Sequence, residues 1–72
     1  MNSSAIFILK SVGIAIKAKS FLTAAGIDAK IIKYTSKDSG CRYGISVARA
    51  QSDTASSVLN ENRIVPLNQF FA

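Results

Sequence analysis

The apolar and polar positions near the start of the chain predict a strand followed by a helix. Residues 5–9 form a short apolar run rich in strand formers, which is typical of a fully buried strand. Ser11 is a favourable helix N-cap residue, and Gly26 stands where a left-handed helix C-cap is expected. Apolar residues recur at helical spacing between them, and the expected buried face consists of Ile14, Ala18, Phe21, Leu22 and Ala25.

The next pattern is the period-two alternation of two further strands. Residues 28–34 alternate along the chain and predict the second strand. Residues 43–47 read Tyr-Gly-Ile-Ser-Val and predict a third strand, with large residues on one face and small residues on the other. Residues 35–40 between them have the composition of a turn, and Cys41 follows directly. We therefore expect Cys41 to lie in the polar connection between these two strands.

The following segment predicts a short second helix. Ser52 and Asp53 are candidate caps at its start. Its serine and threonine content makes it a weak helix by propensity alone, so its stability depends on an apolar face. That expected face consists of Ala55, Val58 and Leu59, and residues 60–62 predict a turn after it.

The last strand is expected at residues 63–67. Pro66 restricts this strand to an edge of the sheet, because proline has no backbone N–H to donate. Phe70 and Phe71 follow it. Two adjacent aromatics can cover the core of the same chain or meet a second subunit in a homodimer, and the intramolecular interpretation comes first.

The order of these elements is strand, helix, strand, strand, helix, strand. With right-handed crossovers, this order favours an α+β fold of the ferredoxin-like kind, a two-layer sandwich. An antiparallel four-stranded sheet would then have both helices on one face. The 72 residues contain no linker, repeat or low-complexity segment, so residues 1–72 are expected to form a single domain.

Composition narrows the chemistry that this chain can perform. It has one cysteine and no histidine, which excludes zinc fingers, Ser-His-Asp triads and two-cysteine redox motifs. We expect no metal and no cofactor. The apolar run at residues 5–9 is too short to span a bilayer, and no signal-peptide pattern is present. We therefore expect a cytoplasmic protein with no membrane contact, in which a lone thiol stays reduced.

The charge balance is basic. Nine Lys and Arg residues stand against four Asp and Glu residues, so the formal net charge is +5. Such a charge attracts anions, acidic partners or nucleic acid, and it also serves plain solubility. It does not choose among these functions.

Cys41 is the candidate functional residue. In the expected fold the connection that holds it lies at the same edge of the sheet as Ser11 and the start of the first helix. Cations and a helix N-terminus both favour the reactive thiolate, and Gly40 frees the backbone beside it. The cationic residues expected around this edge are Lys10, Lys37, Arg42 and Arg63. The alternative is that Cys41 only packs in the core, as free cysteines often do.

The loop at residues 39–45, Ser-Gly-Cys-Arg-Tyr-Gly-Ile, resembles the cysteine loop of the selenium/sulfur carrier protein-like family. The Ala25-Gly26-Ile27 helix end is also similar. Two departures are Arg42, where the family usually has glycine, and the missing proline-rich lead into the loop. The resemblance implies that Cys41 accepts sulfur or selenium from a donor protein and hands it to an acceptor protein. It implies a carrier without turnover of its own, with no second catalytic residue.

Two other functions remain open from the residues. One is a module that binds anions or nucleic acid, because the RNA-recognition version of this fold stacks bases on aromatics of its central strands. Phe7 and Tyr43 are the candidates for such stacking, although Tyr43 shares a face with Ile45 and Val47 and equally suits the core. Nucleic acid is therefore the less favoured partner. The other is an interaction domain without chemistry, in which Cys41 is structural.

Overall fold

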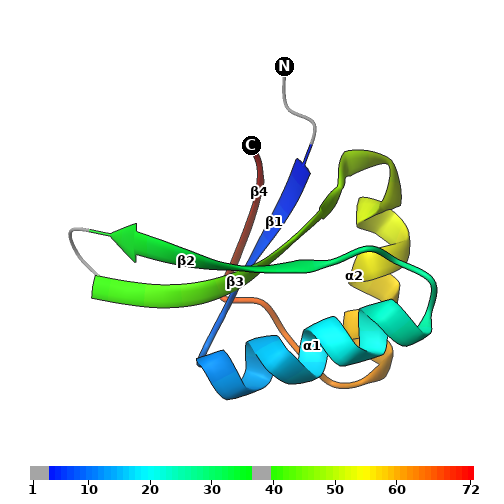
Figure 1. Ribbon diagram of the computed structural model, residues 1–72, viewed down its shortest axis with the longest axis horizontal. Coiled ribbons are helices and arrows are strands. Elements are labelled where there is room, and N and C mark those ends of the chain that lie inside the picture. The colour runs from blue at the N-terminus through cyan, green and yellow to red at the C-terminus, as the bar shows by residue number, and fades with distance from the viewer. Residues whose placement is uncertain (1–3, 37–39) are drawn as a thin grey trace.

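The protein is an α+β sandwich in which two helices accompany a four-stranded antiparallel sheet (Figure 1). A computed structural model describes residues 4–36 and 40–72. The sheet has the strand order β2-β3-β1-β4, and every pairing is antiparallel. The expected βαββαβ ferredoxin-like fold is therefore confirmed. Its elements are β1 (Ser4–Leu9), α1 (Val12–Ala24), β2 (Lys30–Ser36), β3 (Gly40–Ala48), a 3-10 turn (Arg49–Gln51), α2 (Ser52–Glu61) and β4 (Asn68–Phe71).

The main core lies between the helices and one face of the sheet. Phe7 of β1 lies opposite Ile45 of β3, and both side chains are fully buried. Leu22 of α1 and Leu59 of α2 belong to the same buried cluster. Neither helix is long, so most of their stability comes from this shared apolar contact rather than from intrinsic propensity.

The buried face of α1 differs in part from the expected one. Ala18 and Leu22 are buried as expected, but Ala15 is buried as well and Phe21 is 37% exposed. The apolar residues of α1 are distributed over several sides of the helix, so the sequence pattern alone does not define a single buried face. Contact with the sheet selects which side is covered. On α2 the expected face is confirmed, with Ala55 and Leu59 buried and Val58 packed against the core.

The opposite face of the sheet has a smaller apolar layer of its own. Side chains alternate along β1, so Ile6 and Ile8 point away from the main core, yet both are almost fully buried. Tyr34 of β2 and Phe70 of β4 form an aromatic pair on this face, with ring centroids 5.8 Å apart. Gly44 lies beneath this layer, where a Cβ would approach a β1 backbone oxygen to 2.7 Å. Only glycine fits there without a backbone shift.

The ends of α1 confirm the expected caps. The Ser11 hydroxyl accepts a hydrogen bond from the Ile14 N–H at 3.3 Å. Gly26 has a φ of 83°, and the Ile27 N–H donates to the Leu22 carbonyl at 2.9 Å. The Gly26 N–H also donates to the Thr23 carbonyl at 3.0 Å. These two C-terminal bonds form a Schellman motif, which closes the helix and needs a left-handed residue at the glycine position.

The end of α2 has the same motif without a glycine. Arg63 occupies the left-handed position with a φ of 60°, and its N–H donates to the Asn60 carbonyl at 3.0 Å. The Ile64 N–H donates to the Leu59 carbonyl at 2.8 Å. A left-handed conformation is unfavourable for a residue with a Cβ, so Arg63 stores local strain.

The expected caps of α2 are wrong. The N-cap residue is Gln51, which makes no side-chain cap bond, and Ser52 is already helical and buried. The chain leaves β3 directly into the 3-10 turn, and the Ser52 N–H donates to the Arg49 carbonyl. A backbone turn therefore starts this helix where a polar side chain was expected, while Asp53 lies in the first helical turn and favours it electrostatically.

The expected position of the last strand is also wrong. The strand is β4, after Pro66, and Phe70 and Phe71 are strand residues. Arg63 belongs to the motif that ends α2, and Pro66 has no N–H to donate. Pairing with β1 therefore starts at Leu67, whose N–H donates to the Ile8 carbonyl at 2.8 Å. The expected edge position is confirmed, because β4 ends one side of the sheet.

Candidate functional site

Cys41 lies on a two-stranded arm formed by the ends of β2 and β3. Leu9, the last residue of β1, pairs with Tyr43, whereas β3 already begins at Gly40 and β2 continues to Ser36. The first residues of β3 thus extend past the end of β1, and Figure 1 shows this arm projecting clear of α1. The expectation that Cys41 lies in a loop is wrong: it is the second residue of β3, because the ladder with β2 continues further toward the turn than the polar sequence suggests.

The Cys41 thiol is exposed. Its register partner is Thr35, whose hydroxyl oxygen lies 4.0 Å from the sulfur, and either atom can donate. Gly40 precedes it with a φ of 72°, a conformation that residues with a side chain rarely adopt. Gly40 therefore has the unusual backbone conformation that was expected for the residue before Cys41. An exposed sulfur on a projecting arm is accessible to the active site of another protein.

The register decides which cations share the face of Cys41. Neighbouring residues on a strand point to opposite faces, so Arg42 lies on the far face from Cys41, opposite Tyr34 and partly buried. Lys33, which is exposed, lies on the same face as Cys41 and diagonally across the ladder from it. Such diagonal neighbours are within reach of long side chains. Lys37 lies outside the described residues.

Lys33 is a residue that the sequence reasoning missed. The proximity of Lys33 to Cys41 follows only from the strand register. Cys41 pairs with Thr35, and Lys33 precedes Thr35 by two residues on the same face of β2. With Cys41 in a loop, no such relation exists.

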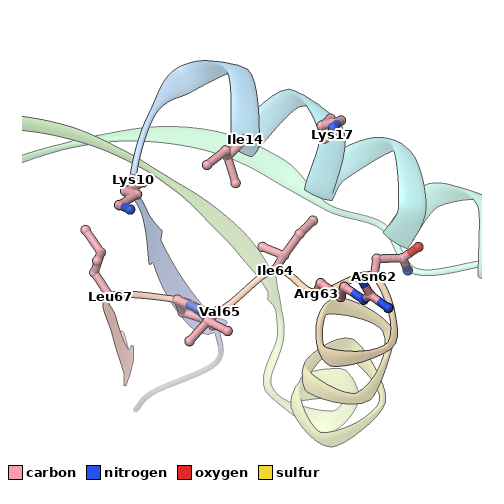
Figure 2. Close-up of a pocket in the computed structure, with 9 residues that line it drawn as sticks. Lys10, Ile14, Lys17, Asn62, Arg63, Ile64, Val65 and Leu67 are labelled. Carbon is pink, nitrogen blue, oxygen red and sulfur yellow. The ribbon is translucent and has the colours of Figure 1, made fainter.

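The other expected site residues lie at the same end of the sheet as Cys41 but not beside its sulfur. Ser11 caps α1 with its hydroxyl, so this oxygen already has a backbone partner. Lys10 and Arg63 both line a groove between α1 and the connection from α2 to β4, and Figure 2 shows them at its two ends. The groove has a volume of about 500 Å³ and is lined by Lys17 as well, but not by Cys41. The structure thus places Lys10 and Arg63 on one groove that does not include the thiol.

The candidate residues for nucleic-acid stacking face the helices. Phe7 is fully buried, and Tyr43 packs against the main core. The interpretation of Tyr43 as a core residue is confirmed. Neither ring lies on the face of the sheet that the helices leave open.

The fold and the site define a class, namely a small ferredoxin-like α+β protein with an exposed cysteine on a β-arm and a separate basic groove. In the described part of the chain, no helix is long and apolar enough to cross a membrane. Comparison of the sequence and the structure with family models, curated proteins and solved structures finds no match.

Proposed function

We propose that this protein is a cytoplasmic thiol carrier, in which Cys41 accepts a sulfur or selenium atom from a donor protein and passes it to an acceptor protein. The observation that supports the proposal most directly is the exposed sulfur on an arm that extends past the end of β1. A carrier has to present one atom to two different active sites in turn. A sulfur at the base of a cleft would make this exchange slower.

The transfer needs no oxidant and no metal. The Cys41 thiolate attacks the terminal sulfur of a donor persulfide, so that a new S–S bond forms on Cys41. The S–S bond of the donor breaks at the same time, and the inner donor sulfur leaves as a thiolate. A nucleophile of the acceptor then takes the terminal sulfur, and the Cys41 thiolate is regenerated. The same displacement transfers selenium.

Two neighbours of Cys41 suit this chemistry. The Lys33 ammonium is a cation on the same face, which favours the approach of an anionic persulfide. The Thr35 hydroxyl is positioned to donate to sulfur in its anionic form. No further catalytic group is needed, since both donor and acceptor bring their own.

The test is intact-mass analysis after incubation with glutathione persulfide. The wild-type protein is expected to gain the mass of one sulfur atom, and the gain should disappear on treatment with a thiol reductant. Cys41→Ser is the matched control and should gain nothing. A wild-type protein that stays unmodified, or a Cys41 that reacts with an alkylating agent only after unfolding, would contradict the proposal.

A further inference from the structure

The groove between α1 and the connection from α2 to β4 has an apolar floor. Figure 2 shows Ile14 of α1 and Ile64 pointing toward one another across it. Ile64 is buried, whereas Val65 and Leu67 are 78% and 50% exposed, so the apolar surface continues outward along this wall. The volume of about 500 Å³ lies inside the range of roughly 300–1,000 Å³ that is usual for small-molecule sites.

The rim of the same groove is cationic. Lys10 lies at one end and Arg63 at the other, while Lys17 projects from α1. The described residues that line the groove include no Asp or Glu. A positively charged rim around an apolar floor complements a ligand that has an apolar body and a negative charge.

The backbone at Arg63 supports a role for its side chain. Arg63 occupies the left-handed position of a Schellman motif, where glycine is the usual residue and is present at the end of α1. Strained non-glycine residues persist only where the surrounding structure holds them in place, and they cluster at functional sites. At this position Arg63 lines the groove.

We propose that this groove binds a small organic anion, with the apolar body of the ligand against Ile14 and Ile64 and its carboxylate or phosphate between Lys17 and Arg63. The site is independent of Cys41, which does not line the groove. Ligand binding is therefore expected to be unchanged in Cys41→Ser. Failure of the groove to bind the ligand and failure of Cys41 to accept sulfur can thus be told apart.

The experiment is a titration of the full chain with sodium decanoate, below its micelle concentration, followed by the backbone amide signals in NMR. Decanoate is expected to shift the signals of residues 10–17 and 62–67 in a saturable manner. Acetate supplies the charge alone, decanol the chain alone and decyltrimethylammonium the opposite charge. Each of the three is expected to bind more weakly than decanoate.

Variants test the cationic rim. Lys17→Gln and Arg63→Gln are each expected to raise the decanoate Kd about threefold, as loss of an exposed ion pair does. Lys19→Gln removes the same charge from an exposed position of α1 that does not line the groove, and it should leave the Kd unchanged. Arg63→Gly removes the cation while relieving the strained backbone, so its Kd is measured alongside its free energy of unfolding, and weaker binding by a variant at least as stable as the wild type reports loss of the cation.

Three results would overturn the proposal. These are shifts spread outside residues 10–17 and 62–67, equal binding of decanoate and decyltrimethylammonium, and equal effects of Lys17→Gln and Lys19→Gln. The first would mean nonspecific adsorption, and the other two would mean that the cationic rim does not select the ligand.

Discussion

At the scale of single residues, the alternation of side chains along β2 and β3 decides which groups surround the Cys41 sulfur. Thr35 and Lys33 share its face, while Arg42, the next residue in the chain, points to the other side of the sheet. A sequence neighbour is thus less relevant to the thiol than a residue eight positions earlier. In the proposed sulfur transfer, the electrostatic contribution is expected to come from Lys33.

The corresponding prediction concerns Lys33→Gln. Loss of this cation should slow the reaction of Cys41 with an anionic reagent such as iodoacetate by about twofold to fourfold, because exposed charge interactions are worth up to about 1 kcal/mol. The effect should shrink at high salt and be absent with neutral iodoacetamide at a pH where the thiol is fully ionised. Stopped-flow or quenched mass spectrometry measures these rates.

The chain offers a matched control on the same strand. Lys30 is exposed on β2 and pairs with Ser46, which puts it on the opposite face from Cys41. Lys30→Gln removes the same charge and should leave the rate within error of the wild type. Equal slowing by both variants would show that net charge, and not the position of Lys33, controls the reaction.

At the scale of the elements, the two helices end in the same hydrogen-bonded motif but with different residues in the left-handed position. Gly26 has this conformation without steric cost, whereas Arg63 has a Cβ and is strained. The sequence signal for a helix end was therefore clear at Gly26 and absent at Arg63. This is why residue 63 was expected in a strand, and why the last strand was placed five residues too early.

We predict that Arg63→Gly stabilises the protein by up to about 1 kcal/mol, because it removes the left-handed penalty and only part of that gain is lost to the greater entropy of glycine in the unfolded chain. Urea denaturation followed by circular dichroism measures the free energy of unfolding. Gly26→Ala is the reciprocal variant and should destabilise by about 1 kcal/mol, since Gly26 has a φ of 83°. A destabilising Arg63→Gly would mean that the Arg63 side chain supports the fold itself.

At the scale of the whole molecule, an aromatic contact ties together the two outer strands of the sheet. Tyr34 belongs to β2 and Phe70 to β4, which lie at opposite edges, and their rings meet over the face that the helices leave open. This layer buries Ile6 and Ile8 on the side away from the main core. A small protein with one thin core gains a second apolar layer in this way.

A double-mutant cycle of Tyr34→Leu and Phe70→Leu tests this contact. We expect a coupling free energy of about 0.5–1.5 kcal/mol, as is usual for aromatic pairs, measured by denaturant unfolding of the two single variants and the double variant. Phe21→Leu with Tyr34→Leu is the matched control, because Phe21 lies on α1 and is partly exposed. Additive effects in the Tyr34 and Phe70 cycle would mean that the two edges of the sheet are energetically independent.

The sequence by itself determined the order of the elements, the fold class, both ends of α1 and the buried face of α2. Those features depend on local patterns, namely side-chain period, a serine cap and a glycine in a left-handed conformation. Only the tertiary structure decided that Cys41 lies within a strand beside Thr35 and Lys33, and that Lys10, Lys17 and Arg63 border one groove. The physical reason is that strand register and the packing of distant segments depend on partners far along the chain, which no local pattern specifies.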